Sequence, residues 1–182
     1  MKDTGIVRKL DNLGRLVIPK EIRRCMRIKE GSPIEFGLLP TGEIVLCKYS
    51  LVNQISDYAE EFSEVLCELF DCIVLIGDRD KIISCNGGSK KVYLNMKFSN
   101  EILDIIDGGN CYKASKMEET TIIPIIQEDK STYISQFIFP ISIQGDVEGL
   151  IILCDTKGET DFTGEHLVAM KLIAKFLSKQ LE

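Results

Sequence analysis

The spacing of hydrophobic and polar residues changes character near residue 50. Before that point the apolar residues fall in short β-branched runs at 5–9 and 14–18, which flank the turn-forming sequence of residues 10–14. This arrangement predicts a strand, a turn and a second strand. Pro19 suits the first position of a helix, because its missing N–H is not needed there, and Gly31 can end that helix in a left-handed conformation.

Two more apolar runs, at 33–39 and 43–48, surround the sequence Pro-Thr-Gly at 40–42 and predict a second hairpin. The first fifty residues therefore predict the order ββαββ. A unit of this size buries little core by itself, and association with a second copy is the usual remedy.

From residue 51 the apolar residues recur every three or four positions, and acidic residues take the other side. The pattern predicts an amphipathic helix over 51–70, which also links the two halves of the chain. Its apolar stripe, like that of the helix expected at 164–181, can pack on a sheet of the same chain or form a helical bundle between copies, and one face can serve each purpose. The positions of the stripe are Leu51, Ile55, Tyr58, Ala59, Phe62, Val65, Leu66 and Leu69.

The rest of the chain mixes strand and helix patterns, which predicts an α+β body, an antiparallel sheet flanked by helices. Gly145 and Asp146 are typical of a hairpin turn, Pro140 predicts a bulge or a break in its strand, and Thr163 can cap the last helix. The expected strands lie at 72–77, 81–86, 121–126, 132–139 and 147–153, and the expected helices at 89–95, 100–107 and 164–181.

The net charge of −6 conceals two halves of opposite sign. Residues 1–50 hold ten Lys and Arg against six Asp and Glu, which gives +4. Residues 51–182 hold twelve bases and twenty-two acids, which gives −10. A basic head on an acidic body predicts an anionic partner at one end only.

Cysteine and histidine usage limits the chemistry. Seven cysteines without a Cys-x-x-Cys pair lie mostly in apolar stretches, which favours reduced thiols that act as small hydrophobic residues. His166 is the only histidine, and no zinc-ligand spacing is present. The sequence predicts no catalytic residue, no metal and no cofactor. It has no apolar run of membrane-spanning length and no apolar signal core, which predicts a cytoplasmic protein without a membrane partner.

The most informative segment is residues 5–24, Gly-Ile-Val-Arg-Lys-Leu-Asp-Asn-Leu-Gly-Arg-Leu-Val-Ile-Pro-Lys-Glu-Ile-Arg-Arg. It resembles the N-terminal domain of the AbrB-type transition-state regulators, a swapped-hairpin DNA-binding fold. Segments 51–61, 76–80 and 88–95 resemble the stage V sporulation protein T family, which joins such a head to a GAF-like domain. The resemblance implies two domains. Residues 1–50 would be an AbrB-type DNA-binding domain, and residues 51–182 a GAF-like sensor and oligomerisation domain.

The resemblance also implies a dimer whose hairpins interleave into one barrel, and a tetramer held together by the bodies. Guanidinium groups can donate two hydrogen bonds to a phosphate or to guanine. A solvated basic face without a partner is the alternative. Asn12 is the only amide side chain of the head, and the resemblance favours AT-rich or shape-sensitive targets over a strict code. The residues that the resemblance assigns to double-stranded DNA are Arg8, Lys9, Arg15, Arg23 and Arg24.

The sequence Asn-Gly-Gly-Ser-Lys-Lys at 86–91 lacks the spacing of a phosphate-binding loop. It is typical of a turn that feeds a helix capped by Ser89. Its functional alternative is the anion-binding edge of an effector pocket at Ser89, Lys90 and Lys91. The cyclic-nucleotide signature of some GAF-like domains, Asn-Lys-Phe-Asp-Glu, is absent, so the identity of any small-molecule effector stays open.

These features predict a DNA-binding transcriptional regulator of sporulation genes, both activator and repressor, that a small molecule can tune. The resemblance implies a place on the nucleoid of the forespore. The main alternative is an AbrB-type antitoxin that neutralises a toxin partner, which the long structured body disfavours. An enzyme built on the body is disfavoured by the lack of a paired nucleophile or a cofactor motif.

Overall fold

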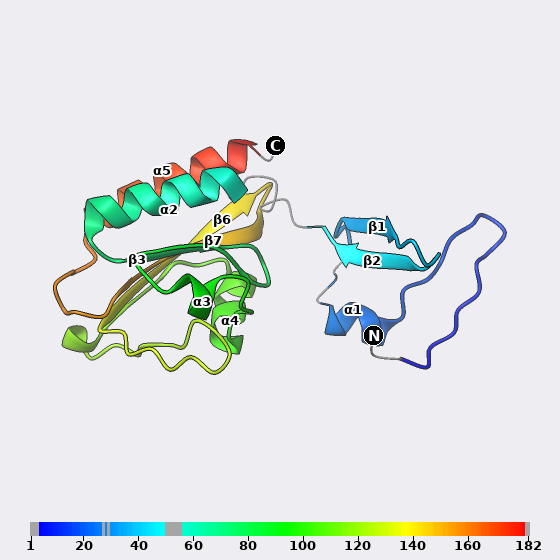
Figure 1. Ribbon diagram of the computed structural model, residues 1–182, viewed down its shortest axis with the longest axis horizontal. Helices are drawn as coiled ribbons and strands as arrows, with labels where there is room; N and C mark the ends of the chain where they lie inside the picture. Colours follow the sequence, from blue (N-terminus) through cyan, green and yellow to red (C-terminus); the bar gives the residue numbers. More distant parts are fainter. Residues whose placement is uncertain (1–3, 27, 29, 50–55, 181–182) are drawn as a thin grey trace. The chain divides into compact units, whose positions relative to one another are not determined.

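The N-terminal part of the computed structural model contains one helix and one hairpin (Figure 1). Helix α1 spans Lys20–Cys25 directly after Pro19, as predicted. Strands β1 (Ile34–Leu38) and β2 (Ile44–Lys48) form the predicted second hairpin, with antiparallel pairing from Ile34 opposite Lys48 to Leu38 opposite Ile44. Gly42 takes a φ of +88° in the turn between them, a conformation that favours glycine. The structure describes residues 4–26, 28, 30–49 and 56–180.

The strands predicted at 5–9 and 14–18 do not form within the chain. Only the turn between them is present, where the Asp11 carboxylate accepts the N–H groups of Leu13 and Arg15 at 3.0 and 2.8 Å. The described residues of both arms belong to no strand. A strand needs a neighbour for its N–H and C=O groups, and among the described residues neither arm is paired with another segment of its own chain. The two strands therefore stay a prediction for the swapped-hairpin dimer.

Among the described residues up to Tyr49, none is buried. The large apolar side chains of this unit point to solvent instead of a core, with Val7 84%, Phe36 73% and Leu38 79% exposed. The unit therefore has almost no hydrophobic core of its own.

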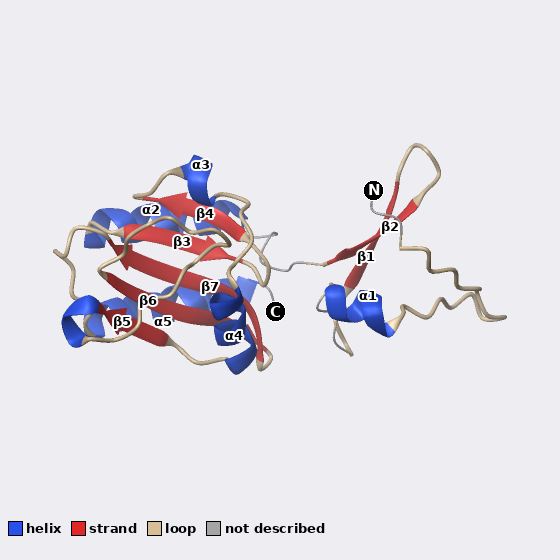
Figure 2. Cartoon of the chain, turned by 90° about the horizontal axis from the view of Figure 1, so that it is seen from below, coloured by secondary structure: helices blue, strands red, loops and turns tan. Residues whose placement is uncertain are grey.

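The C-terminal unit is a five-stranded antiparallel sheet in the order β4-β3-β7-β6-β5. Helices α2 and α5 lie side by side on one face of the sheet, and α3 and α4 lie on the other (Figures 1 and 2). The predicted α+β body is confirmed. Its elements are α2 (Ser56–Phe70), β3 (Ile73–Gly77), β4 (Ile82–Asn86), α3 (Lys90–Tyr93), α4 (Asn100–Gly108), β5 (Tyr112–Ser115), the 3₁₀ turn η2 (Lys116–Glu118), β6 (Ser135–Ile143), β7 (Asp146–Asp155) and α5 (Gly164–Gln180).

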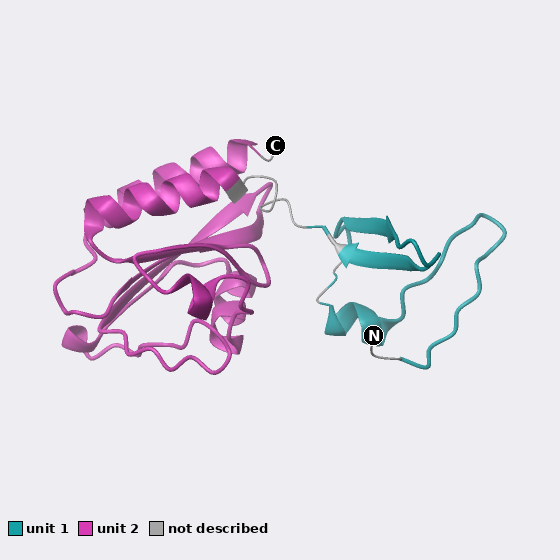
Figure 3. Cartoon of the chain, in the orientation of Figure 1, with its two compact units in different colours: residues 1–49 teal, residues 50–182 magenta. Residues whose placement is uncertain are grey.

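Each face of this sheet carries its own core, because successive strand residues point to opposite sides. In β3, Val74 and Ile76 pack toward α2 and α5, while Leu75 packs toward α3 and α4. The chain divides into the two compact units 1–49 and 50–182 (Figure 3). Within the described ranges, no helix is long and apolar enough to cross a membrane.

The apolar run predicted as a strand at 121–126 is not one. Ile125 and Ile126 are buried, so the segment packs on the sheet, but the buried side chain of Gln136 takes the place of a neighbouring strand. Its Oε1 accepts the N–H of Ile123 at 3.0 Å, and its Nε2 donates to the carbonyl of Ile123 at 2.7 Å. The edge strand beside β6 is β5. Its four residues are too few to show a strand pattern in the sequence.

Pro140 does not break its strand. It pairs with Leu150 inside β6, and the irregularity follows between Ile141 and Ser142. Strand β5 begins at Tyr112, opposite Ile138, and does not reach Pro140, so the missing N–H of Pro140 leaves no β5 partner unpaired. The bulge that proline predicts is therefore present, displaced by one residue.

The amphipathic helix predicted over 51–70 is present as α2 from Ser56, and residues 51–55, Leu51 and Ile55 included, lie outside the described residues. Its stripe divides between two sides. Ala59 and Leu66 are buried against the sheet, whereas Val65 and Leu69 are 55% and 66% exposed on the outer side. Packing on the sheet is thus confirmed for part of the stripe, and the helical bundle between copies stays a prediction for the exposed part.

Candidate DNA-binding surface

Arg15 is held at the turn between the two arms. Its Nε donates to Asp11 Oδ2 at 2.7 Å, and its backbone N–H bonds to Oδ1 of the same carboxylate. These bonds from the Arg15 backbone and side chain lower the pKa of Asp11, so the carboxylate stays ionised and keeps the arginine in place. The Arg15 side chain is 72% exposed, which leaves its terminal nitrogens open to a ligand.

The other four predicted contact residues stand on two elements. Arg8 and Lys9 lie on the first arm, and Arg23 and Arg24 lie in the last turn of α1, where the helix dipole favours positive charge. All four are exposed, and they form no ion pair within the described part of the chain. The structure thus keeps four bases unneutralised and anchors the fifth, although no described contact joins the arm to the helix.

This arrangement suits an anionic polymer better than a small ligand. Extended, exposed side chains on separate elements can each reach a different phosphate, and phosphate contacts fix the register of a protein on a duplex. A small anion would instead need several donors that converge on one point. The basic surface of the head is defined from here on as Arg8, Lys9, Arg15, Arg23 and Arg24.

The three candidate ligand residues in the body are differently engaged. Ser89 precedes α3 but makes no side-chain capping bond. Lys90 Nζ lies 2.5 Å from Glu60 Oε1 on α2, and this bond raises the pKa of Lys90 and lowers that of Glu60. Lys91 is exposed. Lys90 is therefore committed to a carboxylate of its own chain, and the three residues do not converge on a common point through any described contact.

Sequence reasoning missed the polar network that surrounds Glu60. The Ser84 hydroxyl donates to Glu60 Oε2 at 2.7 Å and lies 2.5 Å from the hydroxyl of Ser63, to which Asn86 Nδ2 also donates at 2.7 Å. Ser63 and Ser84 are fully buried. A signal was present, because Ser63 lies on the inner side of α2 between Ala59 and Leu66. The network fixes α2 to β4 and to the start of α3.

The described residues contain no group of three or more His, Cys, Asp and Glu side chains placed to hold a metal ion. All seven cysteines are free thiols. Burial raises the pKa of Cys85 to about 11, so this thiol is protonated at neutral pH.

Two family models match the chain, one for each unit. Residues 54–182 match the model described as "Stage V sporulation protein T C-terminal, transcription factor". Residues 7–53 match the model described as "Antidote-toxin recognition MazE, bacterial antitoxin". The two matches meet at the point where the periodicity of the sequence changes.

Among curated proteins, stage V sporulation protein T of Bacillus subtilis is 39% identical over 182 residues, which cover 100% of this chain and 99% of the relative. The transition state regulatory protein AbrB of the same organism is 51% identical over 49 residues, which cover 27% of this chain and 50% of the relative. The resemblance of the head to the AbrB type is therefore confirmed.

The body matches solved structures of the GAF type. The GAF domain/HD domain protein from Geobacter sulfurreducens aligns with 73% of this chain and 98% of its own length at a TM-score of 0.55 and 11% identity. At that identity the match shows the fold alone, and it confirms the predicted GAF-like sheet with flanking helices. Because one relative matches along the whole chain and the family's C-terminal model matches residues 54–182, the chain belongs to the stage V sporulation protein T family.

Proposed function

We propose that the chain is a DNA-binding transcriptional regulator of sporulation genes, an activator of some and a repressor of others. The observation that carries this proposal is the basic surface of the head, five exposed bases on the unit that is 51% identical to a transition state regulator. We assign residues 1–50 to DNA binding and residues 51–182 to sensing and oligomerisation. The family description as a transcription factor supports this assignment.

The head is proposed to work as a dimer. Its described residues bury no side chain, and its two arms lack strand partners. A second copy supplies the missing core and the missing strand partners. Interleaved hairpins pair the arms and cover apolar side chains such as Val7, Val17 and Phe36, each more than 70% exposed in the single chain. The basic surfaces of two copies then come together on one barrel.

The bodies are proposed to join two such dimers into a tetramer through the outer sides of α2 and α5. On α2, Tyr58, Val65 and Leu69 are exposed and Phe62 is half-buried. Together the four recur at spacings of four, three and four, the pattern of a helix–helix seam. On α5, Val168 and Leu172 are 67% and 73% exposed. The outer seam is defined as Tyr58, Phe62, Val65 and Leu69 of α2 with Val168, Leu172 and Phe176 of α5. Within one chain, α2 and α5 are in aromatic contact along this seam, with the ring centres of Phe62 and Phe176 5.2 Å apart.

Titration of DNA binding against salt tests the function. If the basic surface neutralises phosphates, the logarithm of the binding constant falls with the logarithm of salt concentration, with a slope of about −0.9 per phosphate. Arg8→Ala, Arg23→Ala and Arg24→Ala should each weaken binding and flatten that slope, whereas Lys130→Ala on the body should do neither. Full affinity with an unchanged slope in all three head variants would contradict the proposal.

The antitoxin reading is the second candidate, because residues 7–53 match an antitoxin model. Pull-down of the tagged full chain from its host separates the two readings. Stoichiometric recovery of a small toxin together with loss of DNA affinity would favour the antitoxin. We also propose that the chain is not an enzyme, that it works in the cytoplasm on the nucleoid of the forespore, and that a small molecule bound to the body tunes it.

A further inference from the structure

A small cavity at the end of α2 is lined by three cysteines. Its volume is about 70 Å³, and Cys67, Cys72 and Cys154 all contribute to its wall. The exposed ion pair of Lys157 and Asp71, 3.1 Å from Nζ to Oδ2, belongs to the same wall. Cysteines beside a cavity are potential nucleophiles that the proposed function does not use.

Two of these thiols share one side of the sheet. Cys72 is part of the core beneath α2 and α5, and Cys67 packs against that same core, whereas Cys154 belongs to the core on the opposite face. The chain reverses between the pair: Asp71 takes a φ of 45°, and its N–H bonds to the carbonyl of Cys67 at 2.9 Å. Such a left-handed residue after a helix turns the following residue back toward the last turn, which places Cys72 beside Cys67.

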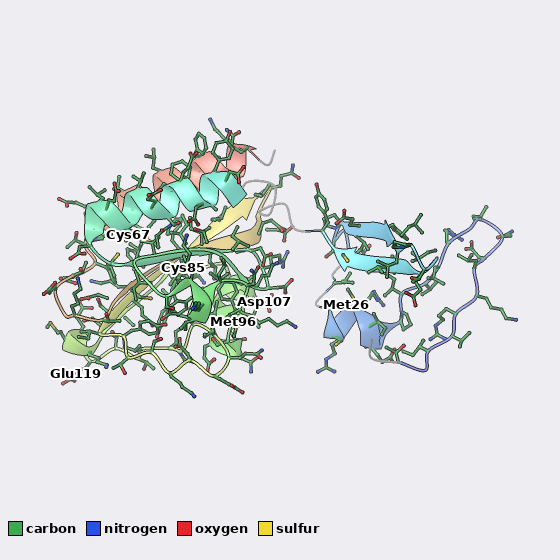
Figure 4. The ribbon with its side chains drawn as sticks, viewed as in Figure 1. Met26, Cys67, Cys85, Met96, Asp107 and Glu119 are labelled. Atoms are coloured by element: carbon green, nitrogen blue, oxygen red, sulfur yellow. The ribbon has the colours of Figure 1, made fainter. Side chains whose placement is uncertain are left out.

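Gly87 lies against both cysteines. A methyl group built on Gly87 would lie 2.8 Å from Cys67 Sγ and 2.5 Å from the carbonyl oxygen of Cys72. Both cysteines thus border the same backbone position after β4, and only a residue without a side chain leaves room for them. Figure 4 shows Cys67 at the end of α2.

Burial has the largest effect on the pKa of each of these two thiols. Burial raises the pKa of Cys72 to about 12, and the neighbouring Cys67 thiol is the next cause. Burial also raises the pKa of Cys67, while the charge of Lys157 opposes that rise. Cys67 is half-buried and Cys72 is buried, so Cys67 is the thiol that a reagent in the cavity meets first.

We propose that Cys67 and Cys72 are a dithiol modification site, which a hydroperoxide converts to a disulfide across the end of α2. The Cys67 thiolate attacks a peroxide oxygen, the O–O bond breaks, and a sulfenic acid forms as the first water or alcohol leaves. The Cys72 sulfur then attacks the sulfenic sulfur, the S–S bond forms, and the sulfenic oxygen leaves as water. The thiols lose two hydrogens and two electrons, and hydrogen peroxide is reduced to two water molecules.

The site responds slowly at neutral pH, because only the thiolate attacks and both thiols have raised pKa values. The link forms where α2 ends, on the helix whose outer side belongs to the outer seam. Because the reaction is slow, the disulfide forms only under sustained oxidation. DNA binding does not require this disulfide.

The test uses the full chain with its three exposed cysteines replaced, Cys25→Ser, Cys47→Ser and Cys111→Ser. This protein is treated with hydrogen peroxide and its intact mass is measured without reductant. The expected result is a loss of two hydrogen masses that dithiothreitol restores, with a rate that increases between pH 7 and pH 9. A mass that stays unchanged, or that rises by whole oxygen atoms only, would overturn the proposal.

Single variants in the same background identify the pair. Cys67→Ser and Cys72→Ser should each abolish the loss of two hydrogens, whereas Cys85→Ser and Cys154→Ser should retain it. Far-UV circular dichroism checks that each variant is folded. Retention of the loss in Cys67→Ser or in Cys72→Ser would show that another pair of thiols reacts and would overturn the assignment even if one variant folds poorly.

Discussion

At the scale of single residues, His166 occupies the position at the start of α5 where a capping box usually has the carboxylate of Glu or the amide of Gln. Its Nδ1 accepts the N–H of Thr163 at 3.0 Å, and the Thr163 hydroxyl lies 3.2 Å from the same nitrogen. In a capping box the residue three positions into the helix bonds back to the capping residue in this way. The single histidine of the chain is therefore structural, and it works only while Nδ1 is unprotonated.

This cap predicts a pH dependence of stability. Burial lowers the pKa of His166 from its ordinary 6.5, so the unfolded state binds the proton more readily than the folded state. The contribution to stability is complete above about pH 6.5 and decreases as the pH falls through 6.5 toward the folded-state pKa. Urea unfolding of the full chain at pH 7.5 and pH 5.5 measures the decrease.

The matched control is His166→Gln, which keeps an acceptor at the capping position but does not titrate. Between pH 7.5 and pH 5.5 this variant should lose less stability than the parent. His166→Ala should cost about 1 kcal/mol at pH 7.5 through loss of the cap. An equal pH slope in His166→Gln and the parent would assign the dependence to another group.

Two glycines separate backbone strain from crowding. Gly87 and Gly145 take φ values of +72° and +96°, so an alanine is strained at both. At Gly87 its methyl would also meet the Cys72 carbonyl at 2.5 Å, whereas at Gly145 nothing lies within 4 Å. Gly145→Ala should therefore cost about 1 kcal/mol, and Gly87→Ala about 1–3 kcal/mol more. Equal unfolding midpoints for the two variants would show that the backbone after β4 can shift away from the added methyl group without loss of stability.

At the scale of elements, the outer seam makes a prediction that two neighbouring residues can test. Leu69 is 66% exposed on the seam, and Glu68 lies about 100° away around α2. Leu69→Arg places a charge in the proposed contact between bodies and should lower the mass of the full chain in solution. Glu68→Arg brings in the same side chain away from the seam and should leave the mass unchanged.

Light scattering with detection of the molar mass measures this difference, and thermal unfolding checks that both variants are folded. A tetramer that persists in Leu69→Arg, or that is lost equally in both variants, would mean that the seam does not join the bodies.

The body shows how far periodicity leads from sequence to element. The strong patterns gave α2, α4, α5 and most strands, because a buried face needs a fixed spacing of apolar residues. The segment 121–126 has the same apolar content, yet its backbone is paired by the side chain of Gln136. A hydrogen bond from a side chain to a distant backbone group leaves no trace in the spacing of apolar residues, so the pattern could not predict it. In the head the arms carry residues typical of strands, yet neither arm pairs with another described segment of its own chain.

The candidate DNA-binding residues were found from an ordered motif, and the structure adds the reason for one of them. Asp11 lies in the turn four residues before Arg15 and both shapes that turn and holds the guanidinium. The motif could not show that Lys90 is engaged by Glu60, because thirty residues separate the two in the chain and only the packing of α2 on β4 and α3 brings them together.

At the scale of the whole molecule, the charge division predicts how the two units share DNA binding. The head carries +4 and the body −10, so the body adds nothing by direct attraction to phosphate. In the proposed tetramer, the benefit of the body comes from linking two head dimers, which can raise affinity by about 10²–10⁴ when the site spans both. On a short duplex that holds one dimer, residues 1–50 should therefore bind as tightly as the full chain or more tightly.

On a long duplex that spans two dimers, the full chain should bind DNA more tightly than residues 1–50. Titration of both proteins on both duplexes at one fixed salt concentration measures the pattern. Much tighter binding by the full chain on the short duplex would mean that the body contacts DNA or reshapes the basic surface directly.

The unpaired arms of the head have a consequence for gene control. If the DNA-binding form exists only after two chains exchange hairpins, folding of the head obeys mass action. At low expression, doubling the number of chains then quadruples the number of DNA-competent dimers. A promoter under this regulator would then respond to the square of the amount of protein until that amount reaches the dimerisation constant of the arms, before any effector molecule is involved.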